Sequence, residues 1–541
     1  METNVSGLPH AWREARISEI TSVNPTLDKA GIPDDLEISF VPMPAVQAES
    51  GIIDVSTNRK FSEVKKGYTP FREGDVLFAK ITPCMENGKM AVVPEVRNGI
   101  GFGSTEFHVL RAQSGINAKY IYYYVSSQGF RREAEHNMSG AVGQRRVTTP
   151  YLSACEVPIS PANKQHRIVA KMEELFSELD KGIENLKTAR AQLKVYRQAL
   201  LKHAFEGKLT AQWRAERNVI PAKTGIQPFN DMDSRLRGND EPLETAAALL
   251  KRIQQERAQR YQQQLADWEA AGKQDSKPKA PKPLPPLTTE ELAELPALPN
   301  EWGWVKLSHI HSHDRFAVKA GPFGSALKKE FYVQDGYKIY GQEQVIRNDF
   351  EYGDYFVDER KYKELASCAV KPFDILISLV GTIGKVLVLP ETAKAGIINP
   401  RLVKISLNLK CYRASFFKSY FESSFLRSLY ANESQGTTMD ILNLGMIQRL
   451  PYPLCSVAEQ DQIIEIIEER FSIIDQLDQT IITALQQAEA LRQSILKKAF
   501  SGQLVPQDPR DEPASVLLAR IKVERAASKE TAKPSRVKIR L

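Results

Sequence analysis

The sequence predicts an α+β fold in which two β-rich domains lie in tandem, each followed by a long helix, with the two helices pairing as an antiparallel coiled coil. Three observations predict this fold. The chain of 541 residues repeats part of itself 295 positions later. Both copies of the repeat carry apolar residues at alternating steps of four and three, as coiled coils do. The stretches before the repeats contain short strand patterns separated by turns.

The repeat is clearest in two phrases, KHAFEGKL at 202–209 and KKAFSGQL at 497–504. Aligned without gaps, residues 165–209 and 460–504 are identical at 18 of 45 positions. Self-similarity over such a length indicates a duplicated structural unit. The chain is therefore a tandem duplication.

The similarity returns outside this stretch. At the start of each half, LPHAWREARISEI (8–20) matches LPNEWGWVKLSHI (298–310). After each repeat, EPLETAAALLKRIQQER (241–257) matches EPASVLLARIKVER (512–525). Each half is thus predicted to run from a variable domain into a conserved helix.

Residues 1–160 and 297–455 are the two predicted β-rich domains. The first contains GYTPFREGDVLFAKITPCMENGKMAVV (67–93), which predicts a turn, a strand, a polar loop and a second strand. The second contains KPFDILISLVGTIGKVLVL (371–389), with Asp374 in the place of Asp75. Between such anchors the two sequences diverge, as expected of related binding domains with two different targets.

The predicted helices lie in residues 161–215 and 456–508, and each is about 40 residues, or about 60 Å, long. The predicted seam consists of Ile168, Met172, Leu175, Leu179, Leu186, Leu193 and Leu200 in the first helix, and Ile463, Ile467, Ile474, Leu477, Ile481, Leu491 and Ile495 in the second. Two tandem copies that pair about a two-fold axis become antiparallel. The alternative is that each helix packs only on its own domain, which so long a stripe disfavours.

The loops of the domains carry the side chains that proteins use on DNA. Arg and Lys contact guanine or phosphate, and Asn contacts adenine. The candidates in the first domain are Lys80, Thr82, Asn87, Lys89, Arg145 and Arg146, and those in the second are Lys328, Lys329, Thr382, Lys385, Asn399 and Arg401. Each alone could equally be a solvated surface residue.

Composition sets the class of protein. The net charge of +7 and the pI near 8.9 are compatible with nucleic-acid binding without requiring it. The five cysteines stand far apart, without a CxxC pair, which favours free thiols in a reducing compartment. No signal segment or membrane span is predicted. We therefore expect a cytoplasmic protein.

The motifs of an enzyme are missing from the sequence. The phrase GTIGK (381–385) is too short for a phosphate-binding loop, and NPRL (399–402) departs from the motif of amino-methyltransferases. The phrase HIHSHD (309–314) places three histidines on one side of a predicted strand, where they could hold a metal. A strand end at the surface is the interpretation we favour, and no metal site is predicted.

Together these pieces resemble the specificity subunit of a type I restriction-modification enzyme. The phrases that carry the resemblance are GYTPFREGDVLFAKITPCMENGK (67–89), GFGSTEFHVLRA (101–112), GPFGSALKKEFY (321–332) and the two KxAFxGxL phrases, and it covers nearly the whole chain. The resemblance implies that residues 1–160 and 297–455 are target recognition domains 1 and 2. Each then recognises one half of a bipartite double-stranded DNA target, and the conserved spacer helices set the gap between the halves.

The resemblance also implies the partners. Methyltransferase subunits, two of them, dock on the helices, and restriction motor-nuclease subunits join them for DNA methylation and restriction. S-adenosylmethionine, ATP and magnesium are expected on those partners, so this chain needs no cofactor and has no catalytic residue. A coiled-coil scaffold with two protein-binding end domains is the alternative from another class.

The connection at 216–296 departs from the family pattern. Its segment 218–240 lacks a counterpart in the second half and reads as an insertion, which we expect to be exposed. A helix is predicted over 241–271 and a Pro/Lys-rich linker over 272–287. Residues 509–541 are predicted to form a short helix and a basic tail. A specificity subunit inactivated by its linker insertion is therefore a further possibility.

Overall fold

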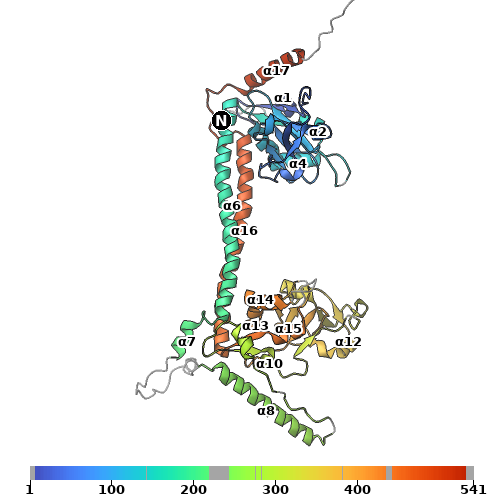
Figure 1. Ribbon diagram of the computed structural model, residues 1–541, viewed down its shortest axis with the longest axis vertical. Helices are drawn as coiled ribbons and strands as arrows, with labels where there is room; N and C mark the ends of the chain where they lie inside the picture. The colour runs from blue at the N-terminus through green and yellow to red at the C-terminus, as the bar shows by residue number, and fades with distance from the viewer. Residues whose placement is uncertain are drawn as a thin grey trace, which may run out of the picture. The chain divides into compact units, whose positions relative to one another are not determined.

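The computed structural model describes residues 7–141, 143–218, 243–273, 276–281, 283–323, 325–380, 382–433 and 442–531. The chain divides into two compact units. The first unit comprises Met1–Thr188 and Thr480–Leu541, and the second comprises Ala189–Gln479. Each unit therefore contains one domain and parts of both long helices (Figure 1).

The first domain contains three sheets. The sheet strand orders are β1-β10, β2-β9-β6-β7 and β4-β3-β8-β5. These strands are β1 (Arg13–Arg16), β2 (Thr21–Val23), β3 (Glu37–Val41), β4 (Asn58–Lys60), β5 (Thr69–Phe71), β6 (Val76–Ala79), β7 (Met90–Val92), β8 (Gly101–Gly103), β9 (Phe107–Ala112) and β10 (Glu156–Ile159). All pairs are antiparallel except β3 with β8.

The second domain repeats this topology strand for strand. Its sheet orders are β11-β20, β12-β19-β16-β17 and β14-β13-β18-β15, with β13 and β18 as the parallel pair. The strands are β11 (Gly303–Lys306), β12 (Val318–Ala320), β13 (Tyr337–Tyr340), β14 (Phe356–Val357), β15 (Ala369–Val370), β16 (Ile375–Ser378), β17 (Val386–Val388), β18 (Gly396–Ile398), β19 (Leu402–Ile405) and β20 (Pro451–Leu454). The duplication thus extends to domains whose sequences have diverged.

The aligned aspartates Asp75 and Asp374 close equivalent turns. The carboxylate of Asp75 accepts a hydrogen bond from the Arg72 N–H at 2.8 Å, and that of Asp374 accepts one from the Lys371 N–H at 3.0 Å. The residue before each aspartate has a positive φ, 78° at Gly74 and 66° at Phe373. These turns start β6 and β16, whose residues are all buried.

Short helices cover the sheets. In the first domain they are α1 (Ile17–Ile20), α2 (Phe61–Val64), α3 (Ala118–Ser126), α4 (Gln128–His136), α5 (Thr149–Ala154), η1 (Met43–Ala45) and η2 (Arg97–Gly99). In the second they are α10 (Leu307–Ile310), α11 (Gln342–Arg347), α12 (Glu359–Glu364), α13 (Ala414–Phe421), α14 (Ser424–Glu433), α15 (Leu444–Arg449), η3 (Lys329–Phe331) and η4 (Ala366–Cys368). Helices α3 and α13 occupy equivalent places and bury aromatic faces, among them Tyr120 and Phe416.

The long helices are α6 (Ala162–Phe205) and α16 (Val457–Phe500). In the first unit Arg492 forms an ion pair with Asp180. In the second unit Arg190 pairs with Asp478 at 2.7 Å and Arg197 with Asp475 at 3.0 Å. As the residue numbers on α6 rise, those of the paired residues on α16 fall, so the helices are antiparallel (Figure 1). The predicted fold class is confirmed.

Two predicted seam residues need correction. Leu477 is 47% and Leu491 51% exposed, whereas the other predicted seam positions are buried or half-buried. The stripe on α16 advances by about 3.6 residues a turn, as in a straight helix. It contains Ile463, Ile467, Phe471, Ile474, Asp478, Ile482, Leu485, Ala488, Arg492, Leu496 and Ala499. A strict seven-residue repeat drifts by about 20° per repeat relative to a straight helix. Asp478 therefore takes the place predicted for Leu477, and Arg492 the place predicted for Leu491.

The segments that follow the two long helices contain further helices. They are α7 (Ala211–Asn218), α8 (Ala246–Ala270), α9 (Thr289–Ala293) and α17 (Ala514–Thr531). Helix α8 buries Ala246, Leu249 and Ile253 in the core of the second unit, and α17 buries the equivalent alanine, leucine and isoleucine in that of the first. Of the predicted insertion, residues 219–240 lie outside the described residues, as do 532–541 of the basic tail.

The histidine-rich phrase is not a strand. His309 belongs to helix α10 and is only 6% exposed. Three or more His, Cys, Asp or Glu side chains do not gather anywhere in the described ranges in a way that could hold a metal ion. Within the same ranges, no helix combines the length and apolar composition needed to cross a membrane.

Candidate nucleic-acid interface

Three loops meet at one edge of the first domain. The loop after β6 begins at Lys80, whose N–H donates to the Glu106 carbonyl at 2.9 Å in the turn before β9. The Lys80 carbonyl accepts a hydrogen bond from the Val147 N–H at 2.8 Å, and the Thr82 N–H donates to the Arg145 carbonyl at 3.0 Å. Main-chain hydrogen bonds therefore hold the three loops together.

The same frame recurs in the second domain. The N–H of Leu379, directly after β16, donates to the Arg401 carbonyl at 3.0 Å in the turn before β19. The Leu379 carbonyl accepts from the Leu442 N–H at 3.2 Å. These bonds are equivalent to those of Lys80, so both domains hold three loops in one arrangement.

The frame brings most of the predicted binding residues together. Lys80, Thr82, Arg145 and Arg146 lie on the joined loops of the first domain, and Thr382, Lys385, Asn399 and Arg401 lie on the two equivalent loops of the second. Exposed side chains at these edges include Asn87, Thr382, Lys385 and Arg401. The edges thus offer amide, hydroxyl and cationic groups, the kinds that contact base edges and phosphates.

Several of these side chains already hold protein partners. Arg146 makes a bidentate contact with Glu106, with nitrogen–oxygen distances from 2.8 to 3.2 Å. Arg145 lies 3.7 Å from Glu135, and Lys89 donates to the Met43 carbonyl at 3.2 Å. The hydrogen bond from Arg146 lowers the pKa of Glu106 below its ordinary value. Arg146 therefore holds two loops together besides presenting charge.

The two lysines predicted in the neighbouring segment lie at its 3-10 turn. Lys328 and Lys329 are both exposed at η3, and Lys328 lies 3.7 Å from Glu330. Their segment begins near Asn399, because the Gly321 N–H donates to the Leu402 carbonyl at 2.9 Å. A Cβ on Gly321 would lie 1.9 Å from the Asn399 carbonyl oxygen, so only glycine allows this approach.

Sequence reasoning missed Glu106. Its phrase GFGSTEF carries only the family resemblance, and a carboxylate does not suggest contact with DNA. Its equivalent on the main-chain frame is Arg401, of opposite charge. This difference between aligned turns is the signal that could have identified Glu106 beside the predicted Arg401.

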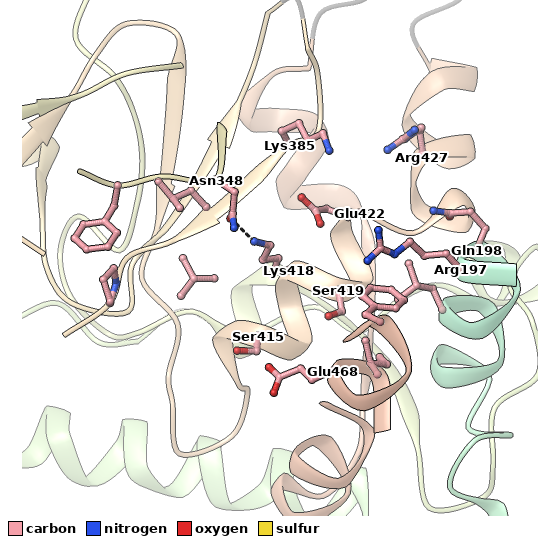
Figure 2. A pocket seen from close by; sticks show the side chains of 17 residues that line it. Arg197, Gln198, Asn348, Lys385, Ser415, Lys418, Ser419, Glu422, Arg427 and Glu468 are labelled. Carbon is pink, nitrogen blue, oxygen red and sulfur yellow. Dashed lines mark hydrogen bonds between the residues drawn. The ribbon is translucent and has the colours of Figure 1, made fainter. Parts of the chain in front are cut away.

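A groove in the second unit adds charge near the edge. It has a volume of about 670 Å³ between α13, α14 and the helix pair, and Figure 2 shows Lys385, Lys418 and Arg427 around Glu422. Burial lowers the pKa of Lys418, and the charge of Lys385 adds to the effect. Sequence reasoning named only Lys385 here.

The equivalent groove of the first unit has about 460 Å³ and a different charge. Tyr122 takes the place of Lys418 in the aligned helices. Arg131, which corresponds to Arg427, donates to the Glu49 carboxylate at 2.8 Å and to the Glu86 carbonyl at 2.6 Å. The two units therefore present grooves at equivalent places that differ in volume and in charge.

Comparison with known proteins agrees with this geometry. Residues 9–188 match the family model of the type I restriction modification DNA specificity domain. The chain is 28% identical to the EcoAI specificity subunit of Escherichia coli over 503 residues, which cover 88% of this chain and 80% of that protein. It is 25% identical to the EcoEI specificity subunit of the same organism, with coverage of 88% and 81%.

Solved structures share the fold. A chain from a structure of the type I R-M system aligns with a TM-score of 0.61 at 17% identity, over 92% of this chain and 99% of that one. The HsdS subunit from Thermoanaerobacter tengcongensis aligns with a TM-score of 0.50 at 17% identity, over 92% and 98%. Domain, relatives and fold agree, and over most of its length the chain is similar to the specificity subunits of type I restriction enzymes.

Proposed function

We propose that the chain is the DNA sequence-specificity subunit of a type I restriction-modification complex, with each domain recognising one half of a bipartite target. One observation carries the proposal beyond the family. The two domains share the strand order of all three sheets and the main-chain frame of the loop edge, yet present different side chains there. One frame with two sets of side chains is what two different half-sites require.

The chemistry of the edges supports contact with DNA. Asn87 can accept from and donate to adenine, and Arg401 can bind guanine or phosphate. In the second unit the basic groove adjoins the edge through Lys385. Phosphate contacts of this kind fix position without adding sequence information. Side chains on the loops would then contact the bases, and the cations would contact the phosphates of the DNA backbone.

The remaining parts of the complex are inferred. The helix pair docks the methyltransferase subunits, which carry S-adenosylmethionine and perform the chemistry, and the motor-nuclease subunits use ATP and magnesium. This chain acts without a catalytic residue of its own. It decides where the partners act.

The first experiment maps methylated adenines across the genome of cells with this chain, with the methyltransferase subunit, with both and with neither. We expect a split motif that appears only when both are present. A soluble complex without any motif would point to the scaffold alternative, or to inactivation by the segment at 218–240. The DNA affinity of the purified complex, measured at several salt concentrations, tests the scaffold alternative. A DNA-binding subunit should show an affinity that falls steeply with salt, whereas a scaffold would show no DNA affinity.

Two matched variants then assign the half-sites. Asn87→Ala in the first domain should relax one half of the motif, and Thr382→Ala in the second should relax the other. Each variant serves as the control for its counterpart, since both remove one exposed polar side chain from an equivalent loop. Loss of both halves in either variant would contradict the assignment of one domain to one half.

A further inference from the structure

The same position of the two repeats carries opposite buried charges. Lys164 is the third residue of α6 and Glu459 the third of α16, and they coincide at the repeat offset. Their exposed fractions are 0% and 1%. Charged side chains are almost never buried so fully without partners, so each must be matched by its surroundings.

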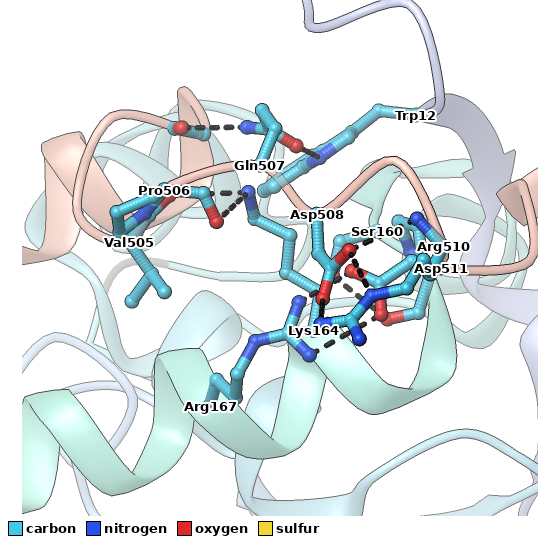
Figure 3. A network of polar contacts seen from close by, with 12 residues as sticks. Trp12, Ser160, Lys164, Arg167, Val505, Pro506, Gln507, Asp508, Arg510 and Asp511 are labelled. Atoms are coloured by element: carbon cyan, nitrogen blue, oxygen red, sulfur yellow. Dashed lines mark hydrogen bonds and ion pairs between the residues drawn. The ribbon is translucent and has the colours of Figure 1, made fainter.

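In the first unit, acceptors surround the lysine (Figure 3). The Lys164 ammonium donates to the carbonyls of Val505 at 3.1 Å and Pro506 at 3.2 Å, in the segment that follows α16. One turn on, Arg167 donates to the Asp511 carboxylate. The segment 505–511 thus offers oxygen acceptors and a negative charge to the start of α6.

In the second unit, donors surround the glutamate. The Glu459 carboxylate accepts from the Thr210 hydroxyl at 2.7 Å, from the Trp302 indole N–H at 2.9 Å and from the Arg214 guanidinium. Thr210 and Arg214 lie in the segment that follows α6. The segment 207–214 thus offers donors and a positive charge to the start of α16.

Pairing between like repeats would reverse these matches. If α6 paired with the α6 of a second copy, Lys164 would face the guanidinium of Arg214, a second cation. If α16 paired with another α16, Glu459 would face the Val505 and Pro506 carbonyls and Asp511. Each case buries a charge against groups of the same polarity, which is strongly unfavourable away from water.

One other contact of the helix pair also favours unlike repeats: the ion pair Arg190–Asp478 would be lost in like pairing, because Leu485 and Ile183 stand at its equivalent positions. The remaining named contacts do not distinguish like from unlike repeats. The ion pairs Asp180–Arg492 and Asp475–Arg197 are the same pair at the repeat offset, so either pairing forms them. The glycines of the KxAFxGxL phrases pack on prolines of the LPxxW phrases in both units, at Pro9 and Pro299. These ion pairs and glycine–proline contacts can form in like and in unlike pairing.

We propose that Lys164 and Glu459 form a charge key that admits the unlike repeat of the chain and rejects a second copy pairing through like repeats. The key acts through the segments 505–511 and 207–214. It adds to the covalent link between the halves, and favours two different domains in one particle over two identical domains from two copies.

The test exchanges the key within the full-length chain. The double variant K164E/E459K keeps composition and net charge, but now the like repeats are matched and the unlike repeats are opposed. Two copies with different affinity tags are expressed together with the methyltransferase subunit. We expect wild-type copies to purify separately, and exchanged copies to purify together in equal amounts with a doubled particle mass.

The control is K164M/E459M, which removes both charges and keeps side-chain length. Without a key, the covalent link favours pairing inside one chain through its high effective concentration, so these copies should purify separately. Joint purification of the control to the same extent as the exchanged variant would overturn the proposal. An exchanged variant that remains a single copy with the wild-type melting temperature would overturn it as well.

A second measurement covers an exchanged variant that fails to fold. In the otherwise wild-type chain, E459K should lower the melting temperature more than E459M does. Adding R214M to E459K should raise it again, although R214M alone lowers it. This reversal of sign would show that the cation introduced by E459K and the Arg214 guanidinium oppose each other. If R214M lowers the melting temperature in both backgrounds, the charges do not select the partner and the proposal is wrong.

Discussion

Replacing Gly502 with alanine tests how the KxAFxGxL phrase stabilises the first unit. Gly502 follows α16 with a φ of 77°, and a Cβ there would lie 2.5 Å from the Pro9 Cγ. Two other glycines of the same unit separate the two effects. Gly74 has a φ of 78° with nothing within 4 Å of its Cβ position, and Gly182 lies exposed in α6 with nothing within 4 Å.

The magnitudes follow from this geometry. Alanine at Gly182 should stabilise by about 0.5–1 kcal/mol, because glycine loses more freedom in a helix. Alanine at Gly74 should destabilise by about 1–2 kcal/mol, the cost of a left-handed conformation. Alanine at Gly502 adds to that conformational cost a collision of about 1–3 kcal/mol. The cost of G502A should therefore be about 2–5 kcal/mol, the largest of the three.

The assay is hydrogen–deuterium exchange along a urea titration, because it measures the two units separately. Peptides from β9 should report the loss in the first unit, and peptides from β19 should be unchanged. In a Pro9→Ala background the collision is gone, so the cost of G502A should fall to that of G74A. Equal costs for G502A and G74A in the wild-type background would refute the role of the proline contact.

Three further predictions concern buried charges, and a fourth concerns the loop edge. Asp75 accepts two hydrogen bonds of 2.8 Å from Arg111, so D75N should destabilise the first unit by about 1–3 kcal/mol in urea unfolding. Burial raises the pKa of Asp374, so the folded state binds its proton more tightly than the unfolded state does. The wild-type chain should therefore lose stability relative to D374N as the pH rises through that pKa. A difference in stability between the two chains that does not change with pH would contradict this. Burial lowers the pKa of Lys164 to about 8, so above that pH the unfolded chain binds the proton more tightly than the folded chain does. The wild-type chain should therefore gain stability relative to K164M as the pH rises from about 8 toward 10.5, which melting curves of the two chains measure. Because Arg146 and Glu106 form one contact, R146A and E106Q should alter the same methylation half-site, and the double variant should do no more than either single one.

The repeat let the sequence predict the fold class, because domain starts, turns and helices that recur in the same order in both halves leave few architectures. The parallel pair β3 and β8 could not be predicted, since parallel strands need long connections whose closure leaves no local signal. The one-residue shift at Leu477 and Leu491 has a similar cause. Heptad counting assumes a supercoil, and the buried stripe instead follows a straight helix.

The candidate edge was predictable in outline and not in detail. Loop polarity indicated Lys80, Thr82 and their neighbours, but nothing local shows that Arg146 is held by Glu106, 40 positions away. Lys164 was harder still. A lysine in the first turn of a helix is normally solvated, and the segment that buries it lies 341 positions further along the chain.

Divergence between the two halves therefore falls into two kinds. At the loop edges the main-chain bonds of Lys80 and Leu379 are preserved while the side chains of Glu106 and Arg401 differ, so the frame stays and its chemistry changes. Such changes can alter the recognised sequence without disturbing the fold. At the helix starts the frame is also preserved, but there Lys164 and Glu459 differ inside the protein, away from the surface that a target reaches. A buried difference of this kind serves assembly, because the groups that match each charge follow the long helix of the other half of the chain.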